Sequence, residues 1–162
     1  MVFVAVLMGS DSDLPQMQTT IDVLKRFDVL YEVRITSAHR MPEDTSAYVK
    51  DADARGCCVF IAAAGLAAHL AGAVSAHTLR PVIGVPIDSG PLQGFDALLS
   101  TVQMPGGIPV ASVAIGKTGA KNAGYLAAQI LAIGDPVLHQ KLIEERQANA
   151  EAIRQKNIDL NL

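Results

Sequence analysis

A histidine between a serine and an arginine marks one place where this sequence could do chemistry. The tetrapeptide Ser37-Ala38-His39-Arg40 follows an apolar run and precedes a segment with helical spacing. Arg40 is permanently charged and can grip a phosphate with its planar guanidinium, and Ser37 adds a hydroxyl. His39 can both give and take a proton near neutral pH. The pattern indicates phosphate binding beside proton transfer. A capping or solvated loop histidine is the other interpretation of His39.

A second polar segment is Gly9-Ser10-Asp11-Ser12-Asp13, again between an apolar run and a segment with helical spacing. Gly9 lets a ligand approach the backbone, and hydroxyls with free amides at a helix start suit a phosphate. Asp13 is suited to bind sugar hydroxyls. The same residues are common in turns and caps, and Asp13 is a plausible N-cap for a helix with Pro15 in its first turn. Both interpretations stay open at this point.

The third candidate loop is rich in Ala and Gly and spans residues 62–70. Backbone amides in such a loop can contact the edge of a flat ring or a carboxylate without a charged side chain. Residues 66–78 are small and apolar nearly all round, which predicts a helix packed on several sides. We therefore interpret His69 as a buried, hydrogen-bonded histidine, and His77 and His139 as structural or exposed.

Motifs for common cofactors and metals are absent from the sequence. There is no Gly-x-x-x-x-Gly-Lys-Ser/Thr loop, no Gly-x-Gly-x-x-Gly after the first apolar run, no Cys/His pattern with metal spacing and no Gly-x-Ser-x-Gly elbow. Cys57 and Cys58 are adjacent in an apolar run, so we expect small buried side chains and no disulfide between them. The simplest expectation is a reaction without cofactor or metal, such as proton transfer, isomerisation or group migration.

The elements that must position these loops are five short apolar runs, at residues 2–8, 29–35, 57–62, 82–85 and 110–115. Each is followed by a segment with helical spacing. Three of the runs, the first, third and fourth, are apolar at consecutive positions, which is typical of parallel strands covered on both faces. The sequence therefore predicts a doubly wound α/β sheet, and in such a sheet the loops beyond the carboxyl ends of the strands form the ligand crevice. Two further loops, 86–91 and 104–109, are candidate walls of that crevice.

The chain shows no linker or repeat, so we expect one domain over residues 1–162, with an α/β core at 1–134 and a helical tail at 135–162. Charged residues alternate with apolar ones between 135 and 157, which predicts an amphipathic helix that reaches a neighbouring subunit. Half of the residues are hydrophobic and only 4% are aromatic. This apolar content is high for a lone domain of this size and favours a homo-oligomer.

The charge pattern argues against two classes of partner. The formal net charge is −3 and no run of Lys or Arg occurs, so neither nucleic acid nor an anionic membrane is expected as the main partner. The first apolar run lacks a basic segment before it and is too short to span a bilayer. We therefore expect a cytoplasmic protein with a small-molecule substrate.

Over nearly its whole length the chain resembles the PurE-type enzymes of purine biosynthesis, the 5-(carboxyamino)imidazole ribonucleotide mutases. Six blocks carry the resemblance, in family order and spacing: Met-Gly-Ser-x-Ser-Asp at 8–13, Ser-Ala-His-Arg at 37–40, Ala-Ala-His-Leu-x-Gly at 67–72, Pro-Val-Ile-Gly-Val-Pro at 81–86, Val-Gln-Met-Pro-x-Gly-x-Pro-Val at 102–110, and Ala-Ile-Gly-Lys at 114–117.

The resemblance implies a three-layer, flavodoxin-like sandwich, assembled as an octamer, with residues 103–105 near a neighbour's site. It implies migration of a carboxylate from the exocyclic nitrogen of an imidazole ribonucleotide to ring carbon 4, through enclosed carbon dioxide and the free aminoimidazole, without ATP, metal or biotin. The implied roles are phosphate binding by Ser10, Ser37 and Arg40, ribose binding by Asp13, proton transfer by His39, and backbone contacts to the ring and carboxylate from Ala64, Gly65 and Leu70.

Two other functions are weighed beside the mutase. A second branch of the superfamily carboxylates the free aminoimidazole directly, and Arg40 and His69 favour the mutase over it. A flavodoxin-like protein that binds FMN is the other, but the scarcity of aromatic residues leaves little to stack on a flavin. The third loop departs from the family pattern, where Gly is usual at the positions of Ala63 and Leu66, and Pro at that of Ala71.

Overall fold

The computed structural model describes residues 1–160 and arranges five parallel strands in one sheet. The elements are β1 (Phe3–Met8), the 3-10 turn η1 (Asp11–Asp13), α1 (Leu14–Arg26), β2 (Tyr31–Ile35), α2 (Pro42–Ala54), β3 (Cys57–Ala64), α3 (Leu70–Ser75), β4 (Val82–Pro86), α4 (Phe95–Val102), β5 (Ala111–Ser112), α5 (Gly116–Ala132) and α6 (Pro136–Asp159). The strand order is β2-β1-β3-β4-β5. This is the predicted flavodoxin-like α/β fold.

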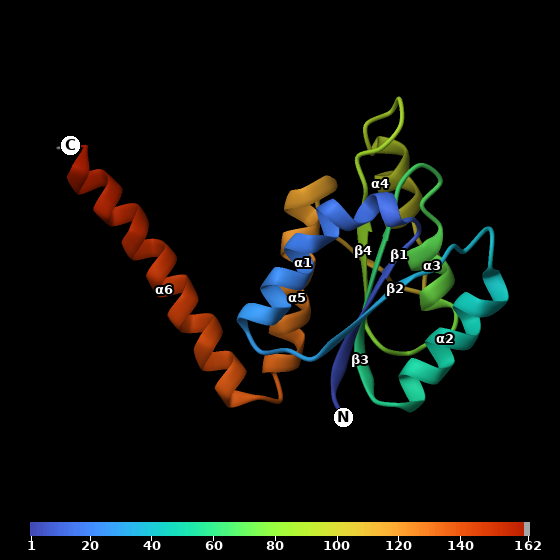
Figure 1. The fold of residues 1–162 in the computed structure, drawn as a ribbon, viewed down its shortest axis with the longest axis horizontal. Coiled ribbons are helices and arrows are strands. Elements are labelled where there is room, and N and C mark those ends of the chain that lie inside the picture. Colours follow the sequence, from blue (N-terminus) through green and yellow to red (C-terminus); the bar gives the residue numbers. More distant parts are fainter. Residues whose placement is uncertain (161–162) are drawn as a thin grey trace.

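Helices cover both faces of the sheet, so the fold has three layers (Figure 1). Helices α1 and α5 lie on one face, and α2 and α3 lie on the other. In β1 the side chains of Val4 and Val6 enter the first of these cores, and those of Ala5 and Leu7 enter the second. Because successive side chains of a strand point to opposite faces, both must be apolar in a covered sheet. The consecutive apolar runs read from the sequence are thereby confirmed as buried strands.

The strand ends bring the candidate loops together. In the parallel register Met8 at the end of β1 lies opposite Ile35 of β2 and Ala63 of β3, and Ala64 lies opposite Pro86 of β4. The chain moves from β1 outward to β2 and then crosses to β3 on the other side of β1. The loops after β1 and β3 therefore diverge at this point, which is where open α/β sheets leave a ligand crevice.

Two predicted elements are shorter than the sequence indicated. The helix expected over 66–78 is limited to α3, because Leu66 has a left-handed backbone with φ of 55° and residues 66–69 form tight turns. A left-handed residue cannot continue a right-handed helix. The strand expected over 110–115 is reduced to β5, since the chain turns at Gly116, with φ of 74°, into α5.

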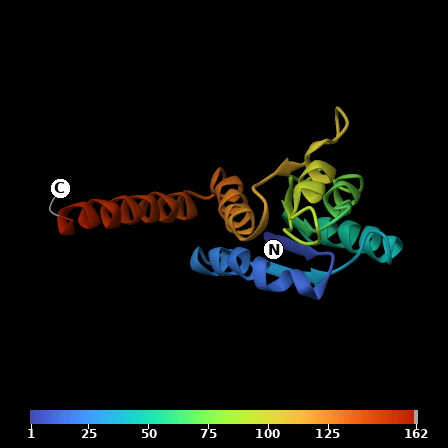
Figure 2. The same ribbon diagram turned by 90° about the horizontal axis from the view of Figure 1, so that it is seen from above.

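Helix α6 confirms the predicted C-terminal helix and projects from the body (Figures 1 and 2). The Asp135 side chain caps it by accepting hydrogen bonds from the amides of Val137 and Leu138. Within this chain only Leu138 of α6 is buried, and later apolar residues such as Ile153 are exposed. The last two residues of the predicted 135–162 tail lie outside the described part of the chain.

Polar contacts fix the first half of α6 to the body. Glu145 accepts hydrogen bonds from Arg26 of α1 and from the Tyr125 hydroxyl of α5, both at 2.6 Å. Burial raises the pKa of Glu145, but these two hydrogen bonds outweigh it and hold the pKa below its ordinary value. Lys141 pairs with Asp28 at 2.8 Å. The direction of α6 is therefore set by contacts near its start.

The remaining expectations concern the cysteines, two histidines and membrane insertion. Cys57 is buried and Cys58 is half-buried, and both are free thiols. Burial raises the pKa of Cys57 to about 11. His77 and His139 are exposed. Within residues 1–160 no helix has the length and apolar character needed to cross a membrane.

Candidate active site

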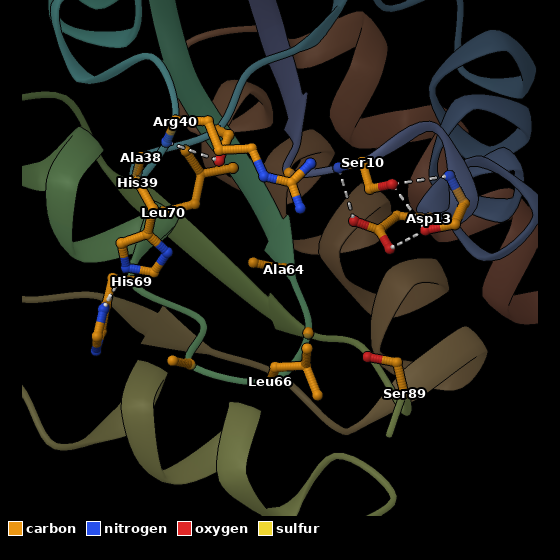
Figure 3. A pocket seen from close by; sticks show the side chains of 15 residues that line it. Ser10, Asp13, Ala38, His39, Arg40, Ala64, Leu66, His69, Leu70 and Ser89 are labelled. Carbon is orange, nitrogen blue, oxygen red and sulfur yellow. Dashed lines mark hydrogen bonds between the residues drawn. The ribbon is translucent and has the colours of Figure 1, made fainter. Parts of the chain in front are cut away.

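A pocket of about 440 Å³ lies at the carboxyl ends of β1, β2, β3 and β4 (Figure 3). It contains all eight residues selected from the sequence, namely Ser10, Asp13, Ser37, His39, Arg40, Ala64, Gly65 and Leu70. Seven further residues complete its lining, namely Gly9, Ser12, Ala38, Leu66, Ala67, His69 and Ser89. The three loops singled out from the sequence thus meet in one cavity, together with a fourth.

The loop after β1 forms a short capped turn. The Ser12 amide donates to Ser10 Oγ at 3.3 Å, and the Ser10 amide donates to Asp13 Oδ2 at 3.2 Å. This is the reciprocal capping pattern, so the interpretation as turn and cap residues is correct for this local structure. Asp13 is at the N-cap position of α1, as expected, but its side chain makes no capping hydrogen bond to that helix and accepts from the Ser10 amide instead. The Ser10 and Ser12 side chains still line the pocket.

The carboxylate of Asp13 is in an unusual environment. Only 6% of Asp13 is exposed. Burial raises its pKa above the ordinary value, against the opposing effect of hydrogen bonds from Ser10 and Ser12. A desolvated carboxylate at a pocket wall gains from donors supplied by a ligand, such as the hydroxyls of a sugar.

The loop after β2 presents Ser37, His39 and Arg40 on a turn. The Arg40 amide donates to Ser37 Oγ at 3.3 Å, and the Met41 amide donates to the Ser37 carbonyl at 3.0 Å. Behind this turn the hydroxyls of Thr36 and Thr45 are 2.6 Å apart in a buried hydrogen bond that fixes the loop to α2. The guanidinium of Arg40 extends toward the centre of the pocket (Figure 3).

Arg40 is an unneutralised cation at this wall. The ion pairs found among residues 1–160 occupy Arg26, Arg55, Arg80, Lys141 and Arg154, and none includes Arg40. An arginine that has no carboxylate partner and lies beside serine hydroxyls is well placed for an anionic group of a ligand.

A pair of histidines closes the side of the pocket opposite Ser10 and Asp13 (Figure 3). His39 Nε2 and His69 Nδ1 are 2.7 Å apart, and the two rings stand at 85°. One ring nitrogen must therefore donate while the other accepts. Both residues are exposed to the pocket side. Such a pair can pass a proton from one ring to the other.

The placement of His69 contradicts the expectation of a histidine buried in an apolar helix. His69 precedes α3, which begins only at Leu70, and its side chain is exposed. The expected hydrogen bond exists, but its partner is His39 and not a core group. The small apolar composition of 66–78 suggested a helix that begins four residues before α3 and ends three residues after it. The Ala-Ala-His-Leu block was the signal that could have placed His69 in the site.

The loop after β3 forms the floor of the pocket through its backbone. The Ala64 carbonyl accepts from the Ile87 amide at 2.9 Å, which joins this loop to the one after β4. A side chain on Gly65 would overlap the Ser89 hydroxyl, so a larger residue here would force Ser89 to move. Leu66 keeps a left-handed backbone although it is not Gly, and its side chain lies against Gly90.

Of the two loops expected to form further walls of the crevice, 86–91 and 104–109, only the first lines the pocket. Loop 86–91 contributes Ser89 to the pocket, as expected, although Ser89 itself was not singled out. Loop 104–109 contributes nothing to this pocket, so the expectation that it forms a wall of this chain's own site is wrong. Its residues Gly107, Ile108 and Pro109 line a separate cavity with residues 78–82. Among residues 1–160 no group of three His, Cys, Asp or Glu is arranged to hold a metal ion.

Comparison with known proteins places the chain in a family. The model of the family described as AIR carboxylase matches residues 3–152. The chain belongs to this AIR carboxylase family. Membership in this family argues against the alternative function, that of a flavodoxin-like protein that binds FMN.

Relatives in this AIR carboxylase family carry one name. The N5-carboxyaminoimidazole ribonucleotide mutase of Synechocystis is 54% identical over 97% of this chain and 88% of its own length. The enzyme of the same name from Bacillus subtilis is 48% identical over 97% of both chains, and that of Escherichia coli is 48% identical over 93% of this chain and 89% of its own. The crystal structure of Treponema denticola PurE superposes with a TM-score of 0.90 at 30% identity and covers 100% of both chains.

Proposed function

We propose that this chain is an isomerase of purine biosynthesis that converts 5-(carboxyamino)imidazole ribonucleotide into 4-carboxy-5-aminoimidazole ribonucleotide. The observation that carries the proposal is the His39–His69 hydrogen bond on one side of a pocket whose other walls hold Arg40, Ser10 and Asp13. The family match and the mutase name of the relatives support it.

The substrate is oriented by its charged end. Arg40 binds the phosphate with the hydroxyls of Ser10 and Ser37, since guanidinium and hydroxyl groups supply the donors that phosphate oxygens need. Asp13 binds the ribose hydroxyls, which satisfy its buried carboxylate. The imidazole then lies on the backbone of Ala64, Gly65 and Leu70, with its reacting atoms toward His39.

The reaction begins with cleavage of the bond between the exocyclic nitrogen and the carboxyl carbon. The electron pair of that bond stays on nitrogen, which takes a proton from His39, and carbon dioxide and the aminoimidazole remain in the pocket. Ring carbon 4 then attacks carbon dioxide, and the proton at carbon 4 passes to His39. One proton leaves and one returns, so the balance needs no ATP, oxidant or other reactant.

His69 acts as the positioning partner of His39. Its Nδ1 atom, 2.7 Å from His39 Nε2, fixes the tautomer and orientation of the His39 ring and allows a proton to be shared between the rings. Leu66, Ala67 and Leu70 line the same cavity and restrict water around the carbon dioxide.

The expected assembly is a homo-octamer, as the resemblance implies, and the expected compartment is the cytoplasm. Apolar side chains left exposed in the single chain support contacts between copies. Phe95, Leu99 and Val102 of α4 are 65%, 59% and 45% exposed at helical spacing, and Ile153 and Ile158 of α6 are about as exposed. Light scattering of the purified protein tests the octamer, and a monomer at working concentration contradicts it.

The activity is tested by mixing purified protein with the nitrogen-carboxylated ribonucleotide, EDTA and no ATP. Growth of the carbon-carboxylated product, and its loss in His39→Asn, is expected. A second arm supplies the unmodified aminoimidazole ribonucleotide with high bicarbonate. If only the second arm gives product, the chain is the direct carboxylase and the mutase proposal is wrong.

A further inference from the structure

Ser89 lines the pocket but is not among the proposed substrate contacts. It follows β4, is half-buried and points into the cavity near Leu66 (Figure 3). Some serine hydroxyls of the chain bond back to the backbone, as that of the buried Ser75 does to the Gly72 carbonyl and that of the half-buried Ser100 to the Asp96 carbonyl. Within residues 1–160 the Ser89 hydroxyl has no such partner. It is available to a ligand.

The backbone around Ser89 is held from two sides. The Ile87 amide donates to the Ala64 carbonyl at 2.9 Å, and the Ser89 amide donates to the Ile87 carbonyl at 3.0 Å. The neighbouring Asp88 accepts a hydrogen bond from Gln16 of α1 at 2.5 Å. The backbone position of Ser89 is therefore set by the scaffold and not by a flexible loop tip.

Ser89 lies beside the part of the pocket that Asp13 borders. A Cβ on Gly65 would overlap Ser89 Oγ, so the hydroxyl lies directly over the Gly65 backbone. A Cβ on Gly9 would lie 3.7 Å from Ala64 Cβ and 3.9 Å from Asp13 Oδ2. Asp13 Oδ2 and Ala64 therefore both lie next to Gly9, and Ala64 is followed directly by the Gly65 that Ser89 covers. The histidine pair is on the opposite side of the pocket (Figure 3).

We propose that Ser89 contacts the substrate and, together with Asp13, recognises the hydroxyl groups of its sugar. The inference rests on the proposed ribonucleotide substrate. Asp13 can only accept hydrogen bonds when ionised, whereas a serine hydroxyl donates or accepts, so the two side chains can satisfy both functions of a sugar hydroxyl. Loss of one hydrogen bond between neutral groups weakens binding about 3- to 10-fold.

The test measures binding, so that it does not depend on turnover. Dissociation constants are determined by calorimetry for aminoimidazole ribonucleotide and its 2′-deoxy and 3′-deoxy forms with wild type, Ser89→Ala and the control Ser46→Ala, a serine of α2 outside the pocket. We expect Ser89→Ala to bind the ribonucleotide about 3- to 10-fold more weakly than wild type, and to lose this difference with one of the deoxy forms. Ser46→Ala should match wild type.

The outcomes separate the two proposals. Equal affinity of Ser89→Ala and wild type for the ribonucleotide overturns the role of Ser89, as does an equal loss with all three ligands. If wild type binds the ribonucleotide with this pattern but fails to isomerise its carboxylated form, the proposed function fails and the sugar contact stands. If wild type binds none of the three ligands, both are wrong. An unchanged thermal midpoint of Ser89→Ala confirms that the variant is folded.

Discussion

His39 Nε2 and His69 Nδ1 share a hydrogen bond of 2.7 Å, with the two rings nearly perpendicular. The two residues come from different loops, one after β2 and one after β3. Only one of the two facing nitrogens can carry the proton of this bond, so each ring determines the tautomer of the other. We expect this relation to govern proton transfer in the pocket.

Removing His69 should impair turnover more than binding. His39→Asn is expected to lose about 100- to 10,000-fold in kcat, the usual contribution of a general acid-base group, while phosphate binding is kept. His69→Ala should lose less, leave KM near that of wild type and displace the pH profile of kcat, and His69→Gln should recover part of the loss. His77→Ala, at an exposed histidine outside the pocket, is the control. An unaltered pH profile in His69→Ala refutes the positioning role.

The ionised side chain of Asp13 is expected to lower the stability of the folded protein, although it helps to bind the substrate. Burial raises its folded pKa above the value of 3.8 for an ordinary Asp, so between these two pKa values the folded protein binds more protons than the unfolded chain. Stability therefore falls as pH rises through this window. Asp13→Asn should raise the thermal midpoint at pH 7 and weaken substrate binding, and the gain in midpoint should vanish below pH 3.8.

Thermal melts at the two pH values provide the check on Asp13. Asp22→Asn, at an exposed position on α1, serves as the control and should change the midpoint little at either pH. A midpoint of Asp13→Asn that is lower than that of wild type at pH 7 would show that the hydrogen bonds to Ser10 and Ser12 outweigh the cost of burial.

The contact between Gly65 and Ser89 predicts coupled substitutions. Gly65→Ala places a Cβ onto Ser89 Oγ and should lower the free energy of unfolding by about 1 to 3 kcal/mol, the usual cost of overpacking. Adding Ser89→Gly removes the obstructing side chain, and the next atom that the new Cβ meets, Ile87 Cβ, is at an ordinary 3.6 Å. Urea unfolding of the double variant should recover part of the loss. Strict additivity of the two substitutions would exclude the contact.

Leu66 stores backbone strain in the third loop. A left-handed conformation costs a non-glycine residue about 1 to 2 kcal/mol, which exceeds the backbone entropy cost of about 0.5 to 1 kcal/mol for Gly. Leu66→Gly should therefore raise the free energy of unfolding by up to about 1 kcal/mol. Leu92→Gly, at a similarly exposed leucine outside the left-handed region, should lower it. Equal losses in the two variants would contradict the strain.

The buried strands and the convergence of the loops could be predicted from the sequence because one physical rule governs each. A strand covered on both faces must be apolar at consecutive positions, as Phe3–Met8 is, and loops after parallel strands share one edge. Residues singled out for their chemistry, such as His39 and Arg40, therefore line one common cavity.

The sequence did not place His69 and Ser89 correctly, because their positions depend on backbone conformation and on contacts between distant loops. The start of α3 is decided by the left-handed Leu66, and a leucine does not by itself indicate that geometry, although Gly is usual at this position in the family. His69 was consequently assigned to a helix interior. Ser89 was missed because its value comes from lying over Gly65, a contact between the loops after β3 and β4 that only the assembled sheet creates.

Following the carboxylate carbon tests the proposed function most directly. The nitrogen-carboxylated ribonucleotide is labelled with ¹³C at its carboxyl group and converted by the protein in excess unlabelled bicarbonate, with EDTA and without ATP. We expect the label to stay in the product as the carboxyl group on carbon 4, because carbon dioxide is released and recaptured inside the pocket. A product that carries unlabelled carboxyl, or no product, would contradict the proposed migration.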